Sequence, residues 1–182
     1  MNPAIMSKAA MASAIAALAL APSASALTFD LEQTRHLSPV QASAIERAVS
    51  FQVNRQVAKF WPGAHASFAP DGIPVYVTDQ ASTTFHCGAV DAACHTIAPA
   101  IYVSWTYLFD VQDSISHEVI ETATDESESG HEICDPVEDQ SYRGLSGVTL
   151  SNFVTPAFYS HQPGPKSFLS ARRLARRKRS PR

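Results

Sequence analysis

The chain has 182 residues, of which 45% are hydrophobic, and its formal net charge is −3 at pH 7. This length suits one ordinary domain with a core that can fold alone. Beyond the first 26 residues, no segment is long and apolar enough to be a transmembrane helix. The chain has no Gly-rich phosphate loop and no Gly-x-Ser-x-Gly elbow, so serine-type hydrolysis has no support.

The charged residues are unevenly distributed along the chain. All seventeen acidic residues but only five of the fourteen basic ones lie in 27–165, and seven basic residues lie in 172–182. Eleven of the acidic residues fall within 110–139. So many like charges repel one another unless they are solvated or hold cations. The spacing of these acids must decide between a solvated surface and a cation site.

The first 26 residues are predicted to be a signal peptide. Lys8 is the only charge before the apolar run 9–21, and the Ala-Ser-Ala sequence at 24–26 has the small-x-small pattern that signal peptidase requires. The apolar run is too short to span a bilayer. A buried N-terminal helix accounts less well for this order of residues. We therefore expect a secreted or periplasmic protein.

The first predicted helix begins at Ser38, because Ser is a preferred N-cap and Pro39 suits the first helical position. The Trp-Pro-Gly sequence at 61–63 is predicted to end this helix. Apolar residues recur along one of its faces at spacings of four and three, which indicates an amphipathic helix. They are Ile45, Val49, Val53, Val57 and Phe60.

Two β-rich runs follow, Ile73–Thr78 and Ala100–Trp105, and both are predicted to be strands. Between them, Cys87 and Cys94 bracket a short segment that a disulfide could close, which suits an oxidising compartment. Cys134 would then be free, buried or part of an intermolecular bridge. His95, next to Cys94, is expected to be a surface or hydrogen-bonded histidine, with a place beside the substrate or behind a metal ligand as the alternative.

A second helix is predicted over about 113–124, followed by an acidic loop at 125–130. After a hairpin-like stretch, Val148–Val154 is the last predicted strand. These elements predict an α+β fold, in which a small mixed sheet packs against two main helices.

The second helix has one apolar face and one acidic strip. At 100° per residue, His117, Glu118 and Glu121 share a strip, which Asp125 joins if the helix continues that far. No Lys or Arg occurs between 110 and 140, so the strip lacks the ion-pair partners of an ordinary solvated face. The apolar face is formed by Ile115, Val119 and Ala123.

The strip has the pattern H-E-x-x-E, which differs by one ligand from the H-E-x-x-H of zinc metalloproteases. His117 and Glu121, four residues apart, can point at a single ion from adjacent turns, and a carboxylate is an acceptable zinc ligand. Glu118 then occupies the position of the general base, which takes a proton from water and passes it to the leaving amine.

A third metal ligand is expected from the second acidic cluster, Glu132–Glu138. Glu132 and Asp135 are the leading candidates, and His131, Cys134 and Asp125 are reserves. If the cluster is extended, Glu132 and Cys134 share one face and Asp135 lies on the other. Spacing does not choose between them.

Three runs of sequence carry a resemblance: S-H-E-V-I-E-T-A-T-D at 116–125, E-I-C-D-P-V-E at 132–138 and S-N-F-V-T-P-A-F-Y at 151–159. They resemble a group of bacterial and phage-associated zincin-like proteins, whose signature is S-H-E-[VL]-x-E-x-x-x-D-P, E-[IV]-x-D-P and V-S-D-F-V-x-P-x-[FW]. The similarity follows the order of elements over 38–159 and is specific from Ser116 onward. It implies a zincin-like fold, a metal at His117 and Glu121, and Glu118 as the base.

The chain departs from this signature at Glu126, where the group has Pro, and at Asn152, where it has Asp. The first change affects how the helix ends, and the second matters only if that Asp is a ligand. All three Met residues lie in the first 26 residues, which argues against the metzincin branch and its Met-turn.

Together these patterns predict a signal peptide at 1–26, a zincin-like domain at 27–162 and a basic disordered tail at 163–182. The expected function is that of a secreted, zinc-dependent, metallopeptidase-like hydrolase acting on peptides or proteins. The first alternative is a non-catalytic secreted module with a structural calcium or zinc site, since three or four oxygen ligands also suit calcium. The second is an acidic secreted scaffold with no bound ion. A block of basic residues at a chain end suits either a solvated tail or a basic arm for anionic surfaces or nucleic acid. We expect the tail to be solvated and to bind no nucleic acid.

Overall fold

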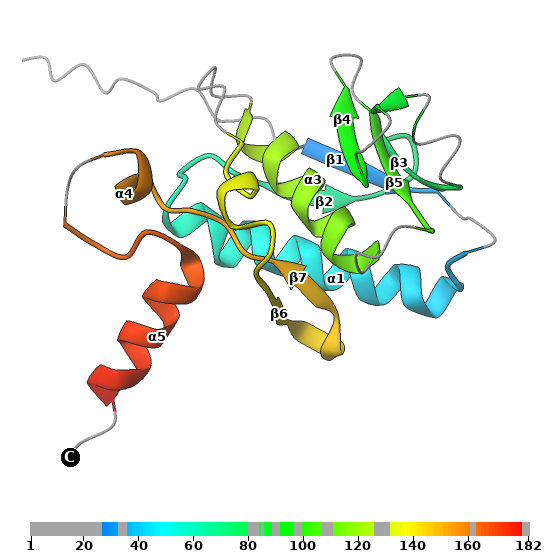
Figure 1. Ribbon diagram of the computed structural model, residues 1–182. Coiled ribbons are helices and arrows are strands. Elements are labelled where there is room, and N and C mark those ends of the chain that lie inside the picture. The colour runs from blue at the N-terminus through cyan, green and yellow to red at the C-terminus, as the bar shows by residue number, and fades with distance from the viewer. Residues whose placement is uncertain are drawn as a thin grey trace, which may run out of the picture.

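A computed structural model describes residues 27–32, 36–79, 84, 86–88, 92–96, 100–106, 111–125, 132–160 and 163–179 (Figure 1). The predicted signal peptide lies outside these residues, as do His131 and Glu126. The side chain of Asp125 is also outside the described part. In the described part of the chain, no helix is long and apolar enough to cross a membrane.

The main sheet has five strands in the order β2-β1-β3-β5-β4. All neighbouring strands run parallel except β4 and β5, which are antiparallel, so β4 is the antiparallel edge strand. The strands are β1 (Leu27–Leu31), β2 (Ala66–Phe68), β3 (Ile73–Thr78), β4 (Ala93–Thr96) and β5 (Ala100–Ser104). Strands β3 and β5 confirm the two predicted runs, whereas β1, β2 and β4 were not predicted.

Helix α1 (Pro39–Arg55) begins as predicted. Ser38 and Gln41 form a capping box, in which each side chain satisfies a backbone N–H of the other residue. The α-helix ends earlier than expected, at Arg55, and a 3-10 turn (Val57–Lys59) continues the chain to Phe60. The predicted apolar face is nevertheless buried. Ile45, Val49, Val53 and Val57 have no exposed surface, and Phe60 is partly buried.

Helix α3 (Val111–Asp125) is two residues longer at its start, and one at its end, than the predicted 113–124. Its apolar face is buried as expected, through Ile115, Val119 and Ala123. The helix contacts β4 and β5 of the main sheet, β7 (Thr149–Ser151) of a second sheet, and α1 (Figure 1). It therefore lies at the junction of both sheets.

The second sheet is a two-stranded antiparallel hairpin of β6 (Ser141–Arg143) and β7. It confirms the hairpin-like stretch, but the last strand is shorter than the predicted Val148–Val154. A short helix, α4 (Pro156–Tyr159), follows. The described part of the chain is thus a mixed α+β fold with a five-stranded mixed sheet and two main helices.

The segment expected to be a disordered tail contains helix α5 (Phe168–Arg179), which extends away from the rest of the chain in Figure 1. Its first turn is anchored. The Phe168 ring stacks on Phe153 with a centroid distance of 5.1 Å, and the Arg172 guanidinium lies 5.6 Å from the centre of the Tyr142 ring. The expectation considered only the charge of the segment and overlooked the aromatic residue at its start.

Cys87 and Cys94 form a disulfide, as predicted, and Cys134 is free and buried. Because Cys94 belongs to β4, the disulfide ties the edge strand to the segment before it.

Candidate metal centre

A buried polar network fixes helix α3 against its neighbours. The hydroxyl of Ser116 donates to Gln52 Oε1 at 2.7 Å and accepts the backbone N–H of Ser151 at 3.0 Å. Gln52 Nε2 in turn donates to the backbone oxygen of Ser151 at 2.7 Å. The three residues are almost fully buried and satisfy one another. The network therefore fixes the rotation of α3 about its own axis at Ser116, the residue before His117.

His117 lies between two carboxylates. Its Nε2 atom is 3.1 Å from Glu121 Oε2, one turn further along α3, and 3.1 Å from Asp135 Oδ1. One ligand atom from each of these residues lies within 4.8 Å of the other two, so the group could hold a metal ion. Asp135 begins a 3-10 turn (Asp135–Val137), which faces the helix.

Glu121 holds this turn in place. Its Oε1 atom accepts the backbone N–H of Cys134 at 2.9 Å and that of Asp135 at 3.3 Å. Glu121 is almost completely buried. One of its oxygens therefore positions the 132–135 segment, while the other faces His117.

Glu118 is buried and contacts a histidine of the edge strand. His95, in β4, has its Nδ1 atom 3.0 Å from Glu118 Oε2. Its Nε2 atom lies 3.9 Å from Glu132 Oε1. His95, Glu121 and Glu132 form a second group whose ligand atoms lie within 4.8 Å of one another.

The two candidate third ligands thus occupy different places. Asp135 lies beside His117, and Glu132 lies beside His95. Cys134, a reserve candidate, is fully buried, and burial together with nearby Glu121 raises the pKa of its thiol well above the ordinary value. A thiol that stays protonated is a poor metal ligand.

The electrostatics of the centre reflect the crowding of its acids. Burial lowers the pKa of His117, but hydrogen bonds to Asp135 and Glu121 outweigh it and raise that pKa to about 11. A hydrogen bond to Glu118 raises the pKa of His95 to about 9. Burial raises the pKa of Glu118, and burial together with Glu121 raises the pKa of Glu132 to about 7. Positive charge is therefore strongly favoured here.

The donor set could hold a metal ion, and its spacing can be compared with that of a zinc site. Two ligand atoms bound to a tetrahedral zinc ion at ~2.0–2.1 Å lie roughly 3.3 Å apart. The distances from His117 Nε2 to its two carboxylate oxygens, both 3.1 Å, are close to that value. Calcium prefers six to eight oxygen ligands, and imidazole is not among them. Imidazole together with carboxylate is a ligand set that transition metals accept.

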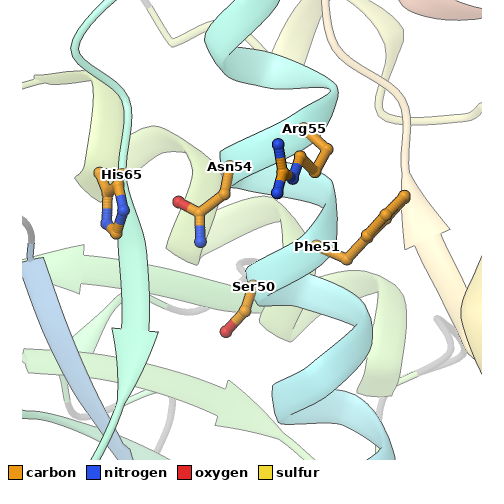
Figure 2. Close-up of a pocket in the computed structure, with 5 residues that line it drawn as sticks. All are labelled: Ser50, Phe51, Asn54, Arg55 and His65. Atoms are coloured by element: carbon orange, nitrogen blue, oxygen red, sulfur yellow. The ribbon is translucent and has the colours of Figure 1, made fainter.

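A surface pocket of about 440 Å³ lies elsewhere and is not part of this centre (Figure 2). It is formed by residues of α1 and by His65, just before β2. Its lining contains no carboxylate, so it offers no comparable cation site. The lining residues are Ser50, Phe51, Asn54, Arg55 and His65.

Sequence reasoning missed Gln52 and gave His95 only a secondary place, whereas the structure sets His95 against Glu118. His95 carries only a weak signal, a histidine next to a cysteine in a short run of mostly small and apolar residues. Gln52 does break the otherwise apolar buried face of α1. A polar residue on such a face indicates a specific buried partner.

Comparison with known proteins returned no match, whether to a protein-family model, to a curated protein or to a solved structure.

Proposed function

We propose that the protein is an exported, zinc-dependent hydrolase of the metallopeptidase type, with a zincin-like fold. The observation that carries the proposal is the position of His117 Nε2, which lies 3.1 Å from a carboxylate oxygen of both Glu121 and Asp135. His117, Glu121 and Asp135 are the proposed zinc ligands. Asp135 is preferred to Glu132 as the third ligand because it is the acid beside His117.

Glu118 is the proposed general base. It follows His117 directly in α3, and burial raises the pKa of its carboxyl group, as is common for groups that exchange protons in catalysis. Glu118 takes a proton from the attacking water and passes it to the leaving amine. His95, through its 3.0 Å contact with Oε2, holds the carboxyl group in one orientation. A bound zinc ion supplies Lewis-acid polarisation of a carbonyl and acidifies water.

Two further observations support the other parts of the proposal. The Cys87–Cys94 disulfide suits an oxidising compartment, which agrees with export. The H-E-x-x-E helix packs beside the edge of a mixed sheet, and this arrangement agrees with the zincin-like resemblance of the 116–159 region.

Exchange of Glu118 for Gln tests the assignment. The variant should retain the zinc content of the parent protein, because Glu118 is not a ligand, and should lose at least about 100-fold in peptide hydrolysis. Zinc is measured by elemental analysis, and hydrolysis by mass spectrometry of a digested peptide mixture with and without chelator. Glu138→Gln is the matched control, since Glu138 is an exposed acid of the same region. Survival of chelator-sensitive hydrolysis in Glu118→Gln would rule Glu118 out as the base.

The abundance of carboxylates supports a second candidate function, a non-catalytic module with a structural cation. Glu118, Glu121, Glu132 and Asp135 together offer many oxygen donors, which calcium favours. Elemental analysis separates the candidates. Calcium in place of zinc, with no hydrolysis of the peptide mixture, would favour the structural role.

A further inference from the structure

The proposed function uses one cation and leaves a second group of donors unassigned. This group comprises His95 of β4, Glu121 of α3 and Glu132, just before the 3-10 turn. Three separate parts of the fold therefore bring one imidazole and two carboxylates to one place. Glu121 belongs to both groups, so the two groups are neighbours.

The contact between His95 and Glu118 resembles the one that supports a metal-binding histidine. Histidines that bind metals usually donate their other ring N–H to a carboxylate, which fixes the tautomer. His95 Nδ1 lies 3.0 Å from Glu118 Oε2, at hydrogen-bond distance. When Nδ1 carries the hydrogen, Nε2 keeps its lone pair, and Nε2 is the atom that faces Glu132.

The spacing of His95 and Glu132 also fits an intervening ion. Their Nε2 and Oε1 atoms are 3.9 Å apart, which is too long for a direct hydrogen bond. Two donors bound to one transition-metal ion at ~2.1 Å lie between roughly 3 and 4 Å apart, depending on the angle at the ion.

The charges of the surrounding side chains also favour a second cation. Four carboxylates meet at the centre, those of Glu118, Glu121, Glu132 and Asp135, and no Lys or Arg occurs between 110 and 140 in the sequence. One divalent cation compensates two of these charges, whereas two cations compensate all four. Pairs of cations that share protein ligands are common in hydrolytic sites.

We infer that the centre has two cation positions, and that His95, Glu121 and Glu132 form the second one, which takes a divalent transition-metal ion. This inference goes beyond the single ion of the proposed function, on which it rests through the shared ligand Glu121. It assigns His95 and Glu132 as ligands, and Glu121 as the carboxylate common to both positions.

Zinc stoichiometry tests the inference without reference to activity. The full exported protein is dialysed against buffered zinc, and zinc per chain is measured by elemental analysis. The parent should bind two ions. His95→Ala and Glu132→Gln should each bind one, and Glu121→Gln should lose both. Glu132 is about half exposed, so Glu132→Gln should fold normally, which circular dichroism and thermal melting verify. His65→Ala and Glu138→Gln are matched controls, away from the donors, and should retain two ions.

The result separates the two proposals. One ion per chain, lost in His117→Ala but kept in His95→Ala and Glu132→Gln, would overturn the second position and leave the proposed function standing. Two ions that persist in both His95→Ala and Glu132→Gln would also overturn it. A parent protein that binds no zinc would remove both proposals.

Discussion

At the scale of single residues, the two histidines act as counter-charges for the acids that surround them. Hydrogen bonds to carboxylates raise the pKa of His117 to about 11 and that of His95 to about 9. In the absence of a cation, protons on these rings balance part of the charge of Glu118, Glu121 and Asp135. Metal ions and protons therefore compete for the same places, because a bound imidazole must be deprotonated.

This competition predicts a pH-dependent stability for the chelator-treated protein. A histidine whose pKa is higher in the folded state stabilises the fold fully below its unfolded pKa, near 6.5, and loses that contribution as pH rises through its folded pKa. The melting temperature of the metal-free protein should therefore fall between pH 6.5 and pH 10. The decrease in melting temperature should be smaller in His117→Gln than in the parent. In His65→Gln it should equal that of the parent. Thermal melts at several pH values measure this, and equal falls in the parent and His117→Gln would contradict it.

At the scale of elements, the position of α3 depends on a few buried hydrogen bonds rather than on its apolar face alone. Gln52 of α1 links α3 to β7 by bonding both the Ser116 hydroxyl and the Ser151 backbone oxygen. An apolar face tolerates small rotations of a helix, whereas hydrogen bonds fix one geometry. The network thus holds His117 and Glu118 at a defined angle to the sheet.

Replacement of Gln52 by Ala should destabilise the protein by about 2–4 kcal/mol, because it leaves two buried polar groups without their partner and opens a cavity. Urea unfolding measures the change in the free energy of unfolding. Val40→Ala is the control in the same helix. Val40 is 79% exposed, so its truncation should change that free energy by less than about 0.5 kcal/mol. Equal effects of the two substitutions would show that the network contributes little.

Local patterns predicted the helices well and the sheet only in part. The buried face of α1 and the acidic strip of α3 follow from the helical period of 3.6 residues. That period depends only on residues that are close together in the sequence. Strands β3 and β5 are rich in β-branched and aromatic residues, whereas β4 reads Ala-Cys-His-Thr. A short strand of this kind is specified by its partner in the sheet, which is distant in sequence.

The same difference between local and long-range contacts explains which residues of the metal centre could be predicted from the sequence. His117, Glu118 and Glu121 share one helix, so their proximity follows from sequence spacing. Glu132 and Asp135 were named, but which histidine each would face depends on how their segment folds onto α3. His95 enters the centre only through the antiparallel pairing of β4 with β5, and no local pattern specifies that pairing.

At the scale of the whole molecule, the predicted signal-peptide boundary coincides with the start of the sheet. Cleavage after Ala26 would make Leu27 the first residue, and Leu27 begins β1. This strand lies in the interior of the sheet, because β2 and β3 pair with its two sides, and Phe29 within it is completely buried. Cleavage within β1 would therefore remove part of the buried core, whereas cleavage after Ala26 would leave the strand whole.

We accordingly predict that the protein recovered from outside the cytoplasm of a bacterial host begins at Leu27. N-terminal sequencing and intact mass identify the first residue. Ala26→Arg should block processing, because signal peptidase requires a small residue at that position. The control Asp30→Asn, beyond the cleavage site, should leave processing unchanged. Removal of 27–31 deletes an interior strand with its buried Phe29 and should abolish folding. A folded, exported form that begins after Leu31 would contradict both the boundary and the role of β1 in the sheet.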